Sequence, residues 1–391
     1  MKIAVIGCGT VGLTSISHLL YNTDFEVCLI YDPKTPALGI GESSTTYLTQ
    51  NLYKGAKFSL ARDGHYIDAT PKLSVKYVNW REHEFHSCLL PGAYALTFDN
   101  HKLRSFCIDR FCKIWKKRFS IIEGNVSLIE NSDKVVLNIN QKKYKFDYIV
   151  DCSGFPKSYE DYDEIYCPVN SAIVYNKLGA PNYDFVYHTA TKNGWMFRLP
   201  LSNRESWGYL YDNTITNFDT AFDDFNTHIK VGKKFNTFNF KSYKAKHFVE
   251  NRIIKNGNKA LFYEPIEALS GFFYEKIMFK SVEYMYNTLG IIPLHRELND
   301  IAEDYKNIIY YLYKGGSNFD TVFWNTATNK CKKELSKSDR YKQQELYLKN
   351  MSREQIEQDY VIREFGSLVW SSWDKNFGYK NMITKNDSLE W

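Results

Sequence analysis

Three glycines near the start of the chain have the spacing of a phosphate-binding turn. Residues 7–12 read Gly-Cys-Gly-Thr-Val-Gly, the pattern G-x-G-x-x-G. Such glycines let the backbone approach a pyrophosphate, whose charge is met by the amides and dipole of the following helix. Asp32 stands twenty residues after Gly12. It could accept a hydrogen bond from a ribose hydroxyl, or serve as a strand-end turn residue before Pro33. The turn predicts a dinucleotide site formed by Gly7, Gly9, Thr10, Val11 and Gly12.

The segments around these glycines have the periodicity that such a site needs. An apolar run at Ile3–Ile6 predicts a strand, and a second run at Val27–Tyr31 predicts the next one. Between them, apolar residues recur at helical spacing at Leu13, Ile16, Leu19 and Leu20. Together they predict a βαβ unit. A later run at 147–154, DYIVDCSG, predicts a further buried strand that ends in a small-residue turn at Gly154.

The periodicity changes in the middle and toward the end of the chain. Alternating apolar residues over about 168–215 predict antiparallel strands. From about residue 281 the spacing is helical, and the charged run at 330–344 predicts a solvated helix face. We therefore expect a mixed α/β (α+β) chain in two parts, a dinucleotide-binding module with its sheet over 1–280 and a helical subdomain over 281–391.

Composition and charge exclude several classes of protein. With 50 basic and 45 acidic residues in 391, the net charge of +5 is too mixed to indicate nucleic-acid binding. The eight cysteines form no C-x-x-C pair, which predicts buried reduced thiols. His83 and His86 have no third ligand nearby, so no metal site is expected. The apolar segment before the glycine turn is too short for the core of a signal peptide, and no run of about 18 apolar residues follows. We expect no membrane span and a cytoplasmic protein.

Spaced motifs along nearly the whole chain resemble those of the flavin-dependent halogenases, the tryptophan halogenase family in particular. Residues 71–81, PKLSVKYVNWR, resemble the family's F-K-x-x-I-K-F-x-N-W-R, and residues 35–48, TPALGIGESSTTYL, resemble P-x-L-G-V-G-E-A-T-I-P. Residues 194–200, GWMFRLP, resemble W-x-W-x-I-P, with Phe197 in place of the second tryptophan. Residues 256–272, NGNKALFYEPIEALSGF, resemble I-G-x-x-x-x-F-V-E-P-L-E-S-T-G. The chain is shorter than typical members, as short phage-encoded ones are, and this resemblance implies a bacterial cell as its setting, a phage-infected one included.

The resemblance implies a fold and a role for each matching residue. The fold would be an FAD-binding Rossmann-like module of the flavin monooxygenase type, with the antiparallel sheet on the substrate side. The flavin would be contacted by Gly39, Gly41, Glu42, Gly154 and Gly257 in addition to the glycine turn. Lys72 and Glu267 would be catalytic, the amides of Leu269 and Ser270 would hold the halide, and Trp195, Phe197 and Pro200 would line the passage between flavin and substrate.

The resemblance also implies the reaction. Reduced FAD, supplied by a separate flavin reductase, would react with O₂ and halide to give hypohalous acid. Lys72 would relay the halogen as a haloamine or direct it as a hydrogen-bond donor, and only a lysine can form the haloamine. Glu267 would increase the electrophilicity of the halogen, stabilise the arenium cation or remove the ring proton. The glutamate in this motif favours a free aromatic substrate of the indole or phenol type over a carrier-tethered one.

Two other functions stay open from the sequence. One is an aromatic hydroxylase on the same fold, and the other is a flavin-binding protein without catalysis. Within the halogenase interpretation, Ala268 replaces a family serine and removes a hydroxyl that could help solvate a small anion. We therefore expect bromide or iodide to be used better than chloride. The sequence leaves open the natural substrate, the position halogenated and the oligomeric state, a homo-oligomer included.

Overall fold

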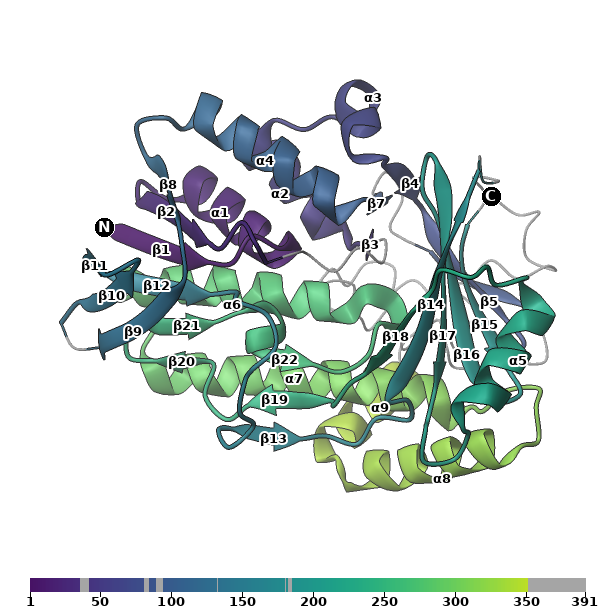
Figure 1. The fold of residues 1–391 in the computed structure, drawn as a ribbon. Coiled ribbons are helices and arrows are strands. Elements are labelled where there is room, and N and C mark those ends of the chain that lie inside the picture. Colours follow the sequence, from purple (N-terminus) through teal and green to yellow (C-terminus); the bar gives the residue numbers. More distant parts are fainter. Residues whose placement is uncertain are drawn as a thin grey trace. The chain divides into compact units, whose positions relative to one another are not determined.

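A computed structural model describes residues 1–35, 42–80, 84–88, 94–131, 133–179, 181 and 185–350 (Figure 1). The chain divides into two compact units. Unit 1 consists of Met1–Pro71, Tyr94–Ile165 and Ser242–Asn299. Unit 2 consists of the described residues within Lys72–Ala93, Tyr166–Lys241 and Asp300–Trp391. Each unit is therefore assembled from three separate parts of the sequence, and the boundary expected at residue 280 falls within helix α6 (Leu269–Met285).

Unit 1 is built on a six-stranded sheet whose order is β20-β21-β12-β1-β2-β8. The strands are β20 (Val249–Glu250), β21 (Ile253–Lys255), β12 (Tyr148–Asp151), β1 (Lys2–Ile6), β2 (Glu26–Tyr31) and β8 (Phe119–Glu123). All neighbours are parallel except β20 and β21. The expected βαβ unit is confirmed, because α1 (Thr10–Asn22) joins β1 to β2.

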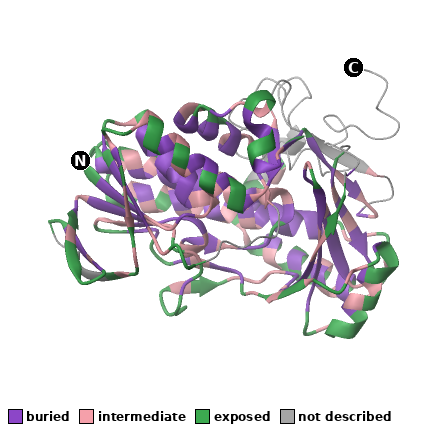
Figure 2. Cartoon of the chain, turned by 45° about the horizontal axis from the view of Figure 1, so that its top comes forward, coloured by how far each residue is buried: buried purple, intermediate pink, exposed green. Residues whose placement is uncertain are grey.

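Both faces of this sheet are covered, as its apolar parallel strands require. Alternate residues of β1, β2 and β12 share one apolar cluster with β10 (Val135–Ile139) and β11 (Lys142–Phe146), which form a small antiparallel sheet with β9 (Val126–Asn131). Helix α1 packs on β1 and β2 and also contacts α2 (Thr46–Ala56), α4 (Asn100–Ile114) and α6. The strands of this six-stranded sheet are mostly buried (Figure 2).

Short elements complete unit 1. One three-stranded sheet joins β13 (Tyr162–Glu164), β19 (Tyr243–Ala245) and β22 (Leu261–Phe262), and another joins β3 (Glu42–Ser43), β7 (Ala95–Phe98) and β4 (Thr70–Lys72). The short helices are α3 (Leu60–Asp63), η1 (Gly64–Ile67), η2 (Gly257–Lys259) and η3 (Ile266–Ala268).

Unit 2 is built on a seven-stranded sheet of order β18-β14-β17-β16-β15-β5-β6. The strands are β18 (Asn236–Asn239), β14 (Ser171–Leu178), β17 (Arg204–Tyr211), β16 (Gly194–Pro200), β15 (Val186–Thr191), β5 (Ser74–Val78) and β6 (Phe85–Cys88). The antiparallel strands predicted from 168–215 are confirmed as β14 to β17. The lysine-motif segment adds β5, which runs parallel to β15.

Helices cover unit 2 and end the described chain. Helix α5 (Phe218–His228) packs on the sheet through Ala221 and Phe225. The helical periodicity after residue 281 is confirmed in α7 (Ile291–Lys314), α8 (Val322–Lys337) and α9 (Asp339–Asn350). Helix α7 begins in unit 1 and belongs to unit 2 from Asp300 onward. The charged run at 330–344 is mostly solvated, with Cys331, Leu335 and Tyr341 buried on its other side. No described helix is long and apolar enough to cross a membrane.

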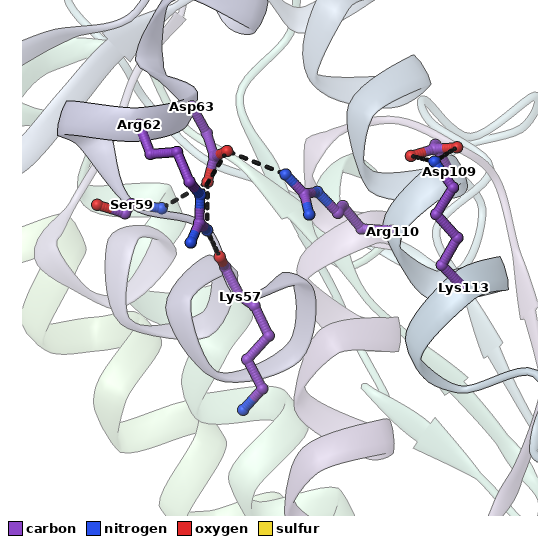
Figure 3. Close-up of polar contacts among 7 residues, drawn as sticks. All are labelled: Lys57, Ser59, Arg62, Asp63, Asp109, Arg110 and Lys113. Carbon is purple, nitrogen blue, oxygen red and sulfur yellow. Dashed lines mark hydrogen bonds and ion pairs between the residues drawn. The ribbon is translucent and has the colours of Figure 1, made fainter.

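A buried carboxylate fastens α3 to α4 in unit 1 (Figure 3). Asp63 accepts hydrogen bonds from the Arg62 guanidinium at 2.7 and 3.0 Å, from Arg110 at 3.0 Å and from the Ser59 amide at 2.9 Å. Arg62 also donates to the Lys57 carbonyl. The hydrogen bond from Arg62 is the main reason why the pKa of Asp63 lies below its ordinary value of 3.8. The carboxylate therefore stabilises the folded state in its ionised form.

Replacing Asp63 with Asn should lower the free energy of unfolding by about 1–3 kcal/mol at pH 7, because charge-assisted hydrogen bonds to a buried group are lost. The folded-state pKa is depressed, so the contribution is complete above about pH 4 and disappears as the pH falls through the folded-state value. Urea titrations of both proteins from pH 7 to pH 3 measure this difference.

Asp109→Asn is the matched control, because Asp109 pairs with Lys113 of the same helix at 2.7 Å while both side chains are exposed. Exposed ion pairs contribute about 0–1 kcal/mol to the free energy of unfolding. Equal effects of the two substitutions at pH 7 would contradict the assigned role of Asp63.

Candidate functional site

The glycine turn between β1 and α1 has one glycine that faces open space and two that cannot be replaced without collision. A Cβ on Gly7, whose φ is +104°, would lie 2.3 Å from the Cys152 carbonyl oxygen, and a Cβ on Gly12 would lie 2.1 Å from the Gly7 oxygen. A Cβ on Gly9, the N-cap of α1, would meet nothing within 4 Å. Two glycines thus permit close packing, and the third leaves the helix N-terminus open to a ligand's phosphates.

The carboxyl ends of three neighbouring parallel strands meet at this turn. Ile6 of β1 pairs with Asp151 of β12, which pairs with Lys255 of β21. After β12, Gly154 has a φ of +95°, and a Cβ there would meet nothing within 4 Å. After β21, Gly257 has a φ of +62°, and a Cβ there would lie 3.2 Å from Val11. In open α/β sheets, ligands bind beyond the carboxyl ends of the strands, so the residues present fit a dinucleotide such as FAD.

Asp32 follows β2 at the same end of the sheet. One of its carboxylate oxygens accepts a hydrogen bond from the Lys34 amide at 2.9 Å, and its carbonyl accepts one from the Thr35 amide at 3.1 Å. The turn interpretation of Asp32 is therefore observed. Hydrogen bonding to a ribose stays a prediction.

Glu42 lies in β3 next to a segment that the structure does not describe, which includes Gly39 and Gly41. Burial, with a smaller contribution from the Asp99 carboxylate, raises the pKa of Glu42 to about 8. At pH 7 this carboxyl group is mostly protonated and can donate a hydrogen bond. Strongly perturbed pKa values of this kind cluster at functional sites.

The segment of Glu267 has an unusual backbone. Glu267 and Ala268 both have left-handed conformations, with φ values of 58° and 55°, immediately before α6 begins. Two consecutive non-glycine residues in this region are strained, and such strain concentrates at functional sites. Ser270 lies in the first turn of α6, where amides attract anions. The Leu269 amide donates to the Ile266 carbonyl, so an anion at Leu269 would compete with that bond.

Contacts that the sequence analysis missed fix this helix and the turn at Gly257. Glu275 of α6 is buried against α1 and α2, where it lies 3.4 Å from the His18 ring and accepts a hydrogen bond from Asn51. The turn at η2 receives hydrogen bonds from Tyr162, to the Lys259 carbonyl at 2.9 Å, and from Tyr243, to the Asn258 carbonyl at 2.6 Å. These partners are far apart in sequence, and no local pattern indicates them.

Unit 2 carries the lysine and the residues of the passage motif. Lys72 is its first residue and is buried, with 5% of its surface exposed. Trp195, Phe197 and Pro200 lie on β16, and the Trp195 ring is buried with its centroid 6.2 Å from that of Trp80. The aromatic motif is thus part of the core of unit 2.

A buried histidine near Lys72 was also missed. The His188 ring lies between Tyr77 and Trp195, with its Nδ1 3.1 Å from the Tyr77 hydroxyl. Burial, and then the charge of Lys72, lowers the pKa of His188 well below 6.5. The imidazole is therefore neutral at pH 7 and adds no second positive charge to that of Lys72.

Within the described part of the chain, no three His, Cys, Asp or Glu side chains are grouped to hold a metal ion. His83 and the side chain of His86 lie outside that part.

A family model and known proteins resemble this chain along most of its length. The family model described as tryptophan halogenase matches residues 2–119 and 87–377. Tryptophan 7-halogenase RebH of Lentzea aerocolonigenes is 21% identical over 432 residues, which cover 86% of this chain and 80% of RebH. Tryptophan 6-halogenase ThaL of Streptomyces albogriseolus is 20% identical over 446 residues, which cover 87% and 80%.

Solved structures share the fold. Xcc4156, a flavin-dependent halogenase from Xanthomonas campestris, superposes with a TM-score of 0.74 at 16% identity, covering 86% of this chain and 83% of that one. A tryptophan halogenase from Shewanella frigidimarina gives a TM-score of 0.74 at 16% identity, covering 93% and 88%. Both confirm the predicted α/β architecture. Since the family model matches both units over most of their length, the chain belongs to the tryptophan halogenase family.

Proposed function

We propose that the chain is a flavin-dependent halogenase that acts on a free, electron-rich aromatic substrate of the indole or phenol type. Lys72 and Glu267, the two residues expected to be catalytic, each lie in an unusual setting, and this observation supports the proposal. Lys72 is a buried lysine, and Glu267 has a strained backbone. Surface residues without a function have neither property as a rule.

The glycine turn, Gly154 and Gly257 would hold FAD, with Glu42 as a neutral hydrogen-bond donor. Reduced FAD, delivered by a separate flavin reductase, would supply with O₂ the two-electron oxidation of halide to hypohalous acid. The amides at Leu269 and Ser270 would hold the halide, helped by the positive end of the α6 dipole.

Lys72 would then control the hypohalous acid. In the haloamine route its neutral amine attacks the halogen, so that an N–halogen bond forms, the O–halogen bond breaks, and hydroxide leaves with the amine proton as water. The aromatic ring takes the halogen as the N–halogen bond breaks, and the ring proton is lost to Glu267 or to water. The nitrogen takes up one proton in place of the halogen, which restores the amine. In the other route Lys72 only donates a hydrogen bond to the acid.

Lys72→Ala should reduce halogenated product by at least about 10²-fold, since a positioned group of this kind contributes 10²–10⁴ in rate. Lys72→Arg separates the two routes. It should be as inactive as the alanine variant if a haloamine forms, and partly active if a hydrogen bond suffices. The assay is mass spectrometry of reactions with FAD, a flavin reductase, NADH, bromide and a panel of indoles and phenols.

Lys76→Arg is the control, because Lys76 lies on β5 and pairs with Glu84 at 3.0 Å. It should stay active. Hydroxylated products from the wild type would instead support the hydroxylase alternative, and full activity of Lys72→Ala would contradict the assigned role.

Glu267→Ala should lower kcat by about 10²-fold or more. Glu267→Gly should be equally inactive yet more stable than the alanine variant by roughly 1 kcal/mol, because glycine adopts a φ of 58° without the penalty that a Cβ carries. Kinetics and thermal unfolding of the two variants measure both effects. An alanine variant with normal kcat would contradict the catalytic role, and equal stabilities would contradict the strain.

Bromide should be used in preference to chloride, because Ala268 offers no hydroxyl to solvate the smaller anion. The measurement is a competition with equal concentrations of the two halides, read by isotope pattern. Ala268→Ser should move the product ratio toward chloride. A wild type that chlorinates faster than it brominates would contradict this preference.

A further inference from the structure

An arginine of helix α4 lies beside the glycine turn. The hydroxyl of Thr10, the first residue of α1, donates a hydrogen bond to Oδ1 of Asn100 at 2.9 Å, which ties the start of α4 to the turn. Arg104 follows Asn100 by four residues and therefore lies on the same face of α4. The face of α4 that carries Arg104 is thus the one that contacts the glycine turn.

Tyr31 fixes the place of the Arg104 guanidinium. The guanidinium carbon lies 4.5 Å from the centroid of the Tyr31 ring, which is the spacing of a cation–π contact. Tyr31 is the last residue of β2, and the carbonyl of the residue before it, Ile30, accepts a hydrogen bond from the Gly7 amide at 2.9 Å. The guanidinium is therefore held at the end of β2, next to the point where the glycine turn begins.

The Arg104 side chain is half-buried, and it forms no ion pair with a carboxylate of the described residues. Glu123, at the end of β8, instead accepts a hydrogen bond from the Tyr31 hydroxyl at 2.8 Å. A guanidinium has a planar fork of donors that binds phosphate through two parallel hydrogen bonds. An arginine in this position is therefore suited to an anionic ligand at the turn.

The balance of charge at this end of the sheet calls for a cation. A pyrophosphate is a dianion near pH 7, and the N-terminus of α1 supplies only about half a positive charge. Residues 3–33, which contain the turn and its helix, include no lysine or arginine. Asp151 ends β12, and Lys259 already lies 3.8 Å from it. Arg104 comes from outside this stretch and supplies the missing charge.

We infer that Arg104 binds the pyrophosphate of the cofactor and supplies the positive charge that the glycine turn lacks. Tyr31 keeps the guanidinium in place through the cation–π contact. The inference rests on the proposed function only in taking the dinucleotide to be FAD. Arg104 acts on the affinity for the cofactor and takes no part in the transfer of halogen.

The test is the affinity for oxidised FAD, measured by the change in flavin fluorescence, and for ADP and adenosine, measured by displacement of FAD. Arg104→Gln should raise the Kd of FAD and of ADP by about tenfold or more, because charge-assisted hydrogen bonds are lost. The affinity for adenosine, which has no phosphate, should stay the same. Added salt should weaken FAD binding more in the wild type than in this variant.

Arg104→Lys should keep part of the affinity for FAD, because the charge stays while the planar fork is lost. Arg252→Gln is the matched control. The Arg252 side chain is also half-buried, and its guanidinium carbon lies 5.0 Å from the centroid of the Tyr148 ring. Tyr148 begins β12, so this contact lies at the opposite end of the same sheet. The control should bind FAD and ADP as the wild type does, and thermal unfolding without cofactor checks that all variants fold.

Two results would overturn the inference alone, in a wild type that binds FAD and halogenates. One is an unchanged Kd for FAD in Arg104→Gln, and the other is an equal loss of affinity for ADP and for adenosine. A wild type that binds FAD through Arg104 and gives no halogenated product would contradict the proposed function and support this inference. A wild type that binds no FAD would overturn both.

Discussion

The close approach of Gly7 to the end of β12 is the constraint on which unit 1 depends. A Cβ at Gly7 would lie 2.3 Å from the Cys152 carbonyl oxygen, inside any van der Waals contact. Because Gly7 has no side chain, the turn after β1 can lie directly against the end of β12. The turns after β1, β12 and β21 can therefore lie together. Gly9 and Gly154 are then left facing open space, and the cofactor site is a product of strand packing.

The contacts of helix α6 explain how the strained backbone at Glu267 is tolerated. Each of the two successive non-glycine residues in the left-handed region costs roughly 1–3 kcal/mol of conformational free energy. Helix α6, which follows directly, is fixed by Glu275 against α1 and α2 on one side and by Tyr274 against the η2 turn on another. The strained residues lie between this helix and the short β22 region, so the contacts of their neighbours determine their conformation.

Local patterns in the sequence predicted much of this arrangement. The glycine turn, the βαβ unit, the antiparallel strands and the C-terminal helices each follow from periodicity within a short window. The burial of Lys72, the neutral state of Glu42 and the effect of the Lys72 charge on the pKa of His188 depend on groups far away in the chain. Tyr162, Tyr243 and Tyr274 are three of thirty tyrosines, and nothing in their spacing marks them as partners of one turn. The domain boundary expected at residue 280 rested on a change of periodicity, which marks where helices begin and not which segments pack together.

The path of the chain has a consequence for synthesis on the ribosome. The backbone passes from one unit to the other after residues 71, 93, 165, 241 and 299. Unit 1 therefore lacks part of its structure until α6 and the residues up to Asn299 have emerged, and unit 2 lacks α8 and α9 until even later. The glycine turn is synthesised early, but β21, whose end lies beside it in the fold, follows about 240 residues later. Folding of the cofactor site therefore begins only after most of unit 1 has been synthesised, and a fragment that stops before residue 299 completes neither unit.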